Sequence, residues 1–102
     1  MKSDAQTEVR RITLRVIGRV QGVGFRCFIE EQARLLPVSG RVCNCHDGSV
    51  LIVAEGSRAA LESLREAAER GPSTAAVTSV NVEWGASQGM PPGFVIGPTE
   101  AA

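Results

Sequence analysis

The chain has 102 residues, 43% of them hydrophobic and 22% charged, a length and composition typical of a single globular domain. Its formal net charge is zero, so no strong electrostatic field attracts nucleic acid or an anionic membrane surface. The chain has no apolar run near the roughly 18 residues that cross a bilayer and no apolar stretch of signal-peptide type at its start, so we expect a cytoplasmic protein.

The first part of the chain predicts a strand, a glycine-rich loop and a helix. Residues 1–9 are polar and without periodicity, which indicates a disordered or frayed terminus. Residues 10–17 alternate between apolar and polar side chains, which is typical of a half-buried strand. Apolar residues then recur at helical spacing over residues 25–36, until Pro37 ends the helix. The glycine-rich loop therefore joins the end of a strand to the start of a helix.

A second strand and a tight turn are predicted next. Over residues 39–46, the alternation of a strand places Val42 and Asn44 on one face. The opposite face of the same strand carries Arg41, Cys43 and Cys45. Asp47-Gly48 is a strong signal for a hairpin turn, so the chain is expected to return beside this strand.

The remaining segments predict two more long elements and a short one. Residues 49–55 are apolar on both faces, which indicates a central strand. Ser57 is expected to cap a helix over residues 58–70. Residues 77–84 predict a fourth strand, and residues 94–96 are compatible with a short edge strand.

The order of these elements, β-α-β-β-α-β, predicts an α+β sandwich of ferredoxin-like type. In that fold an antiparallel sheet carries both helices on one face. We place the domain at residues 10–97 and a tail at residues 98–102. The other face of the sheet is expected to be partly open, with Arg41 and Cys43 on it.

The loop and helix start between Gly18 and Arg26 have the features of an anion site. The glycines of this stretch allow consecutive amides to converge on one point, and the helix adds its free N-terminal donors. Arg26 stands in the first turn, where its guanidinium could grip two phosphate oxygens. The stretch is neither a Walker motif nor a dinucleotide fingerprint, because Cys27 replaces the third glycine of the latter. From the residues alone, a tight turn that binds nothing stays open as an alternative.

Three motifs together resemble the acylphosphatase family. The run GRVQGVGFR, Gly18 to Arg26, is similar to the family signature. A second match, Gly40 to Asn44, is followed by the turn and third strand, and a third match extends from Gly71 to Trp84. The resemblance covers roughly residues 10–96 of the sequence. It implies a small ferredoxin-like enzyme that hydrolyses acyl phosphates without a cofactor.

The resemblance also implies which residues act. Arg26 would bind the substrate phosphate and Asn44 would position the attacking water, so these two are the expected catalytic residues. The phosphate would be held by the loop and first helical turn, namely Gln21, Gly22, Val23, Gly24, Phe25 and Arg26. The only partner expected is a small acyl phosphate, with no nucleic acid, no membrane and no metal, and we expect a monomer.

The sequence departs from the family pattern at four positions. Arg41 stands where the family usually has tryptophan, and Pro37 replaces a common glycine. Cys43 and Cys45 replace polar or charged residues. Neither expected catalytic residue is affected.

The residues around the predicted turn are compatible with two other site chemistries. A metal site would have only Cys43, Cys45 and His46, with Cys27 as the one remaining cysteine or histidine, which is too few dedicated ligands. His46 and Asp47 could form a general-base pair, but Asp47-Gly48 is better explained by turn geometry.

Two other functions are alternatives for a chain of this kind. The fold and first motif resemble the N-terminal domain of larger carbamoyl-transferring maturation proteins, which makes an accessory module an alternative. Only an eighteen-residue tail, residues 85–102, follows the fourth strand, which favours a free-standing enzyme. RNA binding on the open sheet face would need aromatic residues on the central strands, and the second and third strands have none.

Overall fold

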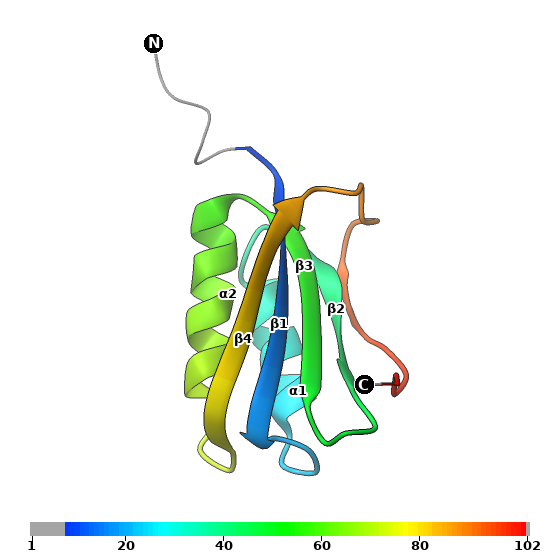
Figure 1. Cartoon of the computed structure of the whole chain (residues 1–102). Helices are drawn as coiled ribbons and strands as arrows, with labels where there is room; N and C mark the ends of the chain where they lie inside the picture. Colours follow the sequence, from blue (N-terminus) through cyan, green and yellow to red (C-terminus); the bar gives the residue numbers. More distant parts are fainter. Residues whose placement is uncertain (1–7, 102) are drawn as a thin grey trace.

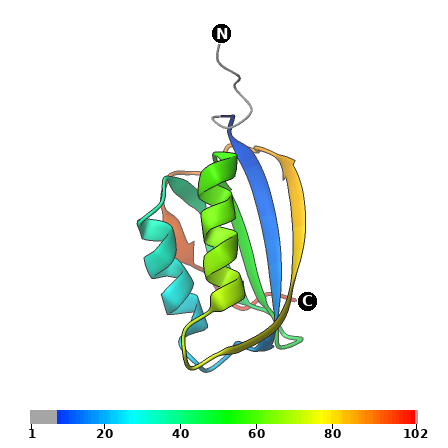
Figure 2. The same cartoon turned by 90° about the vertical axis from the view of Figure 1, so that its left-hand side faces the viewer.

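Two helices cover one face of a five-stranded sheet in the computed structural model, which describes residues 8–101 (Figures 1 and 2). Figure 2 shows the two layers edge-on, with both helices on the same side of the strands. The elements are β1 (Arg10–Arg19), α1 (Phe25–Arg34), β2 (Val38–Asn44), β3 (Val50–Gly56), α2 (Arg58–Arg70), β4 (Ala76–Ala86) and β5 (Phe94–Ile96). The predicted ferredoxin-like fold is confirmed.

The strands lie in the order β4-β1-β3-β2-β5, with β3 in the centre as its apolar sequence predicts. The pairs of β1 with β3 and β4, and of β2 with β3, are antiparallel, whereas β2 and β5 are parallel. Residues 87–93 pass over the end of the sheet where β2 begins, so β5 enters in the same direction as β2 (Figure 1). The sheet is therefore mixed at one edge instead of wholly antiparallel.

The core lies between the sheet and the helices. Ile12, Leu14 and Val16 alternate along β1 and are each 0% exposed. The buried faces of the helices pack onto this row with Phe25, Ile29 and Ala33 from α1 and Ala60, Leu61, Leu64, Ala67 and Ala68 from α2. Burying a large aliphatic side chain stabilises a fold by about 1.5–3 kcal/mol. The core therefore fixes both helices, and with them the start of α1.

The helix ends follow local chemistry. α1 stops at Arg34, two residues before its predicted end, and Leu35 and Leu36 donate to carbonyls three residues back in a tightened last turn. Pro37 explains this shortening, because it disfavours helical geometry at Leu36. α2 has its predicted bounds, and the Ala60 amide donates to the Ser57 hydroxyl over 3.2 Å as a helix cap.

The prediction that Cys43 lies on a partly open face is wrong in one respect, because Cys43 is 0% exposed. Gly97 donates to the carbonyl of Val42, and Glu100 donates to the carbonyl of Asn44, each over 2.9 Å. Residues 97–100 therefore run along the edge of β2 and cover this thiol. Burial first, and the nearby Glu100 carboxylate second, together raise the pKa of Cys43 to about 11. Glu100, predicted to lie in the tail, thus pairs with the sheet.

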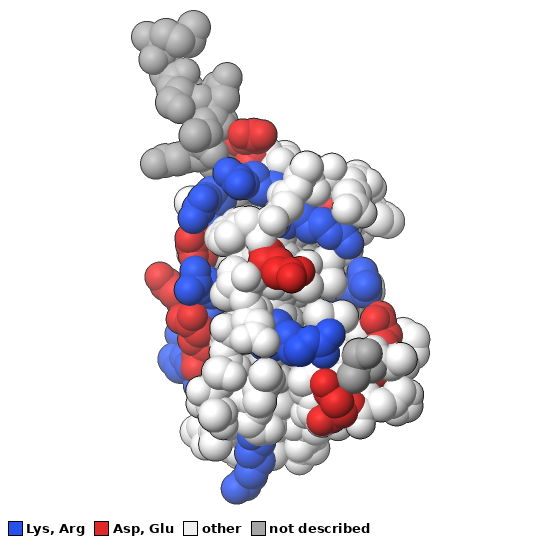
Figure 3. All heavy atoms as spheres, viewed as in Figure 1, with Lys and Arg blue, Asp and Glu red and all other residues white. Residues whose placement is uncertain are grey.

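The rest of the open face carries side chains of both charges, interleaved over the strands (Figure 3). Arg11 pairs with Glu55 at 2.9 Å, and Arg41 with Glu100 at 3.4 Å. None of the helices within residues 8–101 is long and apolar enough to cross a membrane. Residues 1–7, in the predicted frayed terminus, lie outside the described part of the chain.

Candidate active site

The loop over residues 20–24 turns the chain from β1 into α1 at the lower end of the sheet in Figure 1. Val20 and Phe25, at its two ends, are each 1% exposed, so buried apolar side chains hold the loop in place. Gly22 and Gly24 have φ angles of 74° and 81°, in the left-handed region that favours glycine. These two positions let successive amides of the loop face a common point.

The start of α1 offers backbone donors without acceptors. Its N-cap is Gly24, which has no side chain to accept from the first turn. Phe28 is the first residue whose amide donates in the helical pattern, to the carbonyl of Gly24 over 3.0 Å. For the amides from Gln21 to Cys27, no acceptor exists within residues 8–101. Free amides beside the positive end of a helix dipole are the kind of donors that bind anions in proteins.

Arg26 adds a full positive charge to this cradle. It is the second residue of α1, and its side chain is half-buried. Within the described part of the chain it forms no ion pair and no side-chain hydrogen bond, whereas most other arginines pair with a carboxylate or stack on an aromatic ring. Its guanidinium fork is therefore available to a phosphate.

Asn44 lies at the same end of the sheet, on the face that the helices cover. The strand register pairs Val16 with Val50, and Val50 with Asn44, so the asparagine continues a row of core residues. The Asn44 Oδ1 atom is buried, and no group among residues 8–101 donates a hydrogen bond to it. A buried carbonyl oxygen without a donor is costly in a folded protein, which indicates a role in binding.

Gln21 connects the loop to the strand that carries Asn44. Its Nε2 atom donates to the carbonyl oxygens of Cys45 and Ser49, each over 2.8 Å. On the other side of the loop, the Thr74 hydroxyl donates to the carbonyl of Val23 over 2.6 Å. The fold therefore brings the predicted phosphate loop, Arg26 and Asn44 to one end of the molecule.

Comparison with known proteins shows the family of this chain. The family model described as acylphosphatase matches residues 12–96. The chain belongs to the acylphosphatase family. It is 55% identical over 75 residues to the acylphosphatase of Salinibacter ruber, an alignment that covers 74% of this chain and 79% of that relative.

Solved structures show the same acylphosphatase fold. The acylphosphatase from Bacillus subtilis matches with a TM-score of 0.82 at 39% identity, covering 85% of this chain and 97% of that one. Full-length HypF, in a phosphate- and nucleotide-bound form, matches with a TM-score of 0.82 at 28% identity and covers 92% of this chain. The match covers only 12% of the HypF chain, so the fold also occurs as a small part of a much longer protein.

On the open face of this acylphosphatase, a polar network holds the β2–β3 turn. Arg15 donates to the Ser49 hydroxyl over 2.9 Å, and its guanidinium lies 3.8 Å from the Asp47 carboxylate. Asp47 accepts from both the hydroxyl and the amide of Ser49. These bonds, with a smaller contribution from Arg15, lower the pKa of Asp47. A carboxylate already engaged in this way is a poor general base, so the interpretation of Asp47 as a turn residue is the better one.

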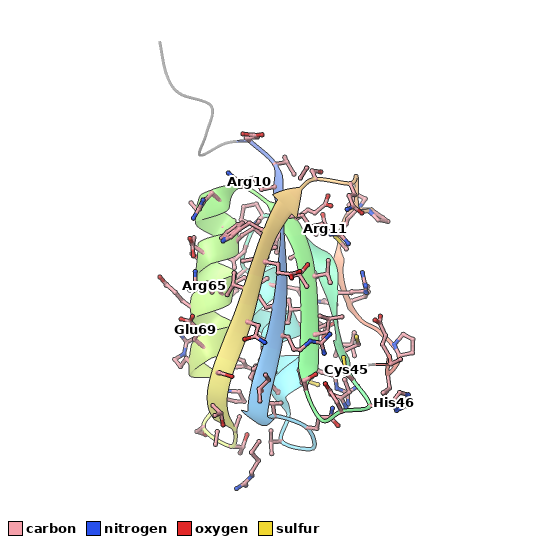
Figure 4. All side chains as sticks on the ribbon, viewed as in Figure 1. Arg10, Arg11, Cys45, His46, Arg65 and Glu69 are labelled. Carbon is pink, nitrogen blue, oxygen red and sulfur yellow. The ribbon has the colours of Figure 1, made fainter. Side chains whose placement is uncertain are left out.

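The three cysteines and the lone histidine do not gather into one site. Cys45 and His46, labelled in Figure 4, lie at the β2–β3 turn. Cys27 is exposed on α1, whereas Cys43 and Cys45 are buried, and all three are free thiols. Residues 8–101 contain no cluster of three or more His, Cys, Asp or Glu side chains that could hold a metal ion.

The sequence alone does not indicate which side chains hold the β2–β3 turn in place. Arg15 and Ser49 come from different strands, and only the strand register brings their side chains together. The contact of Gln21 with the turn is equally non-local. Alternation along β1 does place Arg15 on the open face, which is the one signal that could have directed attention to it.

Proposed function

We propose that the protein hydrolyses the carboxyl-phosphate bond of small acyl phosphates and releases a carboxylate and inorganic phosphate. In this proposal the amides of residues 21–26 and the Arg26 guanidinium hold the phosphate, and Asn44 positions the attacking water. Membership of the acylphosphatase family supports the reaction. The roles of the individual residues rest on the geometry of the site.

The reaction needs little acid catalysis. The leaving group is a carboxylate, whose conjugate acid has a pKa of about 4–5, like a side-chain carboxyl. Such a group departs at neutral pH without first receiving a proton. The protein must therefore position the reactants and stabilise charge on the transferring phosphoryl group, which a cradle of amides and one arginine can do.

The observation that carries the proposal is the unpaired Oδ1 atom of Asn44, buried at the same end of the sheet as the donor-rich loop. An amide oxygen accepts a hydrogen bond from water, and the amide nitrogen can donate to a phosphate oxygen. Asn44 could thus orient a water molecule without removing its proton. We assign that proton to a phosphate oxygen of the substrate, because the Asp47 carboxylate already accepts two hydrogen bonds from Ser49 and is a poor base.

The test is hydrolysis of benzoyl phosphate in the presence of EDTA. Arg26→Ala should weaken inorganic phosphate binding and lower kcat/KM by about 100-fold or more, the usual cost of losing a preorganised charged donor. The matched control is Arg19→Ala, which removes an exposed arginine at the end of β1. Its effect on kcat/KM should stay within about threefold, because water and salt screen an exposed charge.

Asn44→Ala should lower kcat by about 100-fold or more, because it removes the group that orients the nucleophile. Binding of inorganic phosphate, measured as competitive inhibition or by calorimetry, should be nearly unchanged. Asn81→Ala on the exposed side of β4 is the matched control. Near-normal turnover by Asn44→Ala would remove the water-positioning role, and a wild-type protein inactive on benzoyl phosphate would favour the accessory-module alternative.

The site places few constraints on the acyl group, because the proposed contacts are with phosphate and water. We therefore expect a broad range of acyl phosphates to react. A monomeric state and a cytoplasmic location stay predictions from the sequence, and size-exclusion chromatography with light scattering tests the first of them.

A further inference from the structure

We infer that the Gln21 side chain is a positioning residue that sets the location of Asn44 relative to the phosphate loop, an inference that rests on the proposed function of Asn44. Gln21 is expected from the sequence to contribute to phosphate binding. Its side chain is engaged elsewhere, in two hydrogen bonds to the β2–β3 turn.

The orientation of the Gln21 amide follows from its partners. Two carbonyl oxygens, those of Cys45 and Ser49, each lie 2.8 Å from Nε2. Only the amide nitrogen can face two carbonyl oxygens, because an oxygen there would be repelled by both. Both Nε2 hydrogens are therefore committed to the turn.

The two carbonyls lie on either side of the hairpin mouth, directly next to Asn44. Cys45 is the residue after Asn44, and its amide donates to the carbonyl of Ser49 over 2.9 Å. The Cys45 carbonyl in turn accepts from the Gly48 amide over 3.1 Å. Each carbonyl thus accepts one bond that closes the turn and a second bond from Gln21. The side chain of Gln21 therefore bridges the two strand ends just beyond the Asn44–Val50 pair and ties them to the loop.

Two other side-chain hydrogen bonds near the site, from Thr74 and Arg15, fix other segments. Thr74 fixes Val23 to the segment before β4, and Arg15 holds Ser49 from the open face. Neither bond joins the loop to the turn. Within residues 8–101, the two bonds from Gln21 are the side-chain hydrogen bonds that connect the phosphate loop to the hairpin of Asn44. A displacement of about 1 Å between reacting groups can cost up to 100-fold in rate, so this connection should influence turnover.

The test uses Gln21→Met, which keeps the length of the side chain and the backbone amide but removes the donor. We expect kcat for benzoyl phosphate to fall by about 10-fold, while the inhibition constant for inorganic phosphate stays within about twofold. Gln32→Met, at a half-buried position of α1, is the matched control and should change neither value. Urea unfolding establishes that each variant is folded under the assay conditions.

A double-mutant cycle with Asn44→Ala separates positioning from a general structural effect. If Gln21 acts through Asn44, then Gln21→Met should lower the residual kcat of the Asn44→Ala enzyme by less than about twofold. Should Gln21→Met not fold, Gln21→Asn takes its place, because its shorter amide cannot reach both carbonyls.

Three results would overturn the inference: an unchanged kcat in Gln21→Met, a weaker phosphate affinity that accounts for the whole loss, or the same loss with and without Asn44. Near-normal turnover by Asn44→Ala alone would instead remove the proposed function of Asn44, and the inference with it. The single variants therefore show which of the two ideas has failed.

Discussion

The buried carboxylate of Glu55, on the open face of the sheet, should make a pH-dependent contribution to the free energy of unfolding. Its side chain is 4% exposed at the end of β3, and its carboxylate accepts bonds from Arg11, from the Ser87 hydroxyl and from the amides of Gln88 and Met90. Burial alone would raise the pKa of Glu55. The four donors outweigh burial and lower the pKa from 4.5 to about 2.

The shift converts into a free energy of unfolding. A lowering of this size corresponds to about 2–3 kcal/mol at neutral pH. Because the folded pKa lies below the unfolded one, this contribution is complete above about pH 5 and is lost as the pH falls towards 2.

Glu55→Gln is the perturbation, and urea unfolding at pH 7, 5, 4 and 3 is the assay. Glutamine places an NH₂ group against donors that need an acceptor, so the variant should be about 2 kcal/mol less stable at pH 7. The difference from wild type should shrink steadily below about pH 5, because the carboxylate of the unfolded chain binds a proton there while the folded protein keeps it ionised down to about pH 2. Glu66→Gln, at an exposed position of α2, is the control and should change stability by less than about 0.5 kcal/mol.

A difference between wild type and Glu55→Gln that stays constant from pH 7 to pH 3 would refute this reasoning. It would mean that the variant loses packing and not a charged acceptor. Glu55 lies at the opposite end of β3 from the residue that pairs with Asn44, so kcat of the folded variant should stay within about twofold of wild type.

Two further predictions test the site and the sheet. Arg26→Lys should recover less than about a tenth of the kcat/KM lost in Arg26→Ala, because an ammonium lacks the planar fork that grips two phosphate oxygens. Benzoyl-phosphate kinetics measure this recovery. Full recovery would show that a positive charge alone is enough. Gly40→Ala should destabilise the fold by about 1–3 kcal/mol in urea unfolding, because its Cβ would collide with the Val53 carbonyl and lie 2.8 Å from Ala54 Cα. Gly85→Ala, where a Cβ meets nothing within 4 Å, is its control, and equal stability of the two variants would contradict the steric argument.

The sequence predicts the elements well because their signals are local. The alternation along β1, the Ser57 cap and the turn at Asp47-Gly48 all act within a few residues, and the structure has each of them. Helix α1 ends early because the effect of Pro37 competes with the apolar pattern before it.

Contacts between segments that lie far apart in the chain cannot be predicted from its sequence patterns. Burial of Cys43 depends on residues 97–100, which have no pattern that predicts pairing with β2. The bonds of Gln21 to the turn and of Glu55 to residues 87–90 also join segments with no common sequence signal. The roles of Arg26 and Asn44 were available only through the family motifs, and they stay predictions until the variants are assayed.

The position of β1 has a consequence for how the chain folds. β1 pairs with β3 on one side and with β4 on the other, so both of its neighbours come from much later in the sequence. Chains dominated by such distant pairings fold slowly, on millisecond to second timescales, because large loops must close before the pairing stabilises them. During synthesis, the apolar face of β1 therefore stays without strand partners until β3 and then β4 have emerged. Catalytic competence should then appear late in refolding, together with the slowest structural phase.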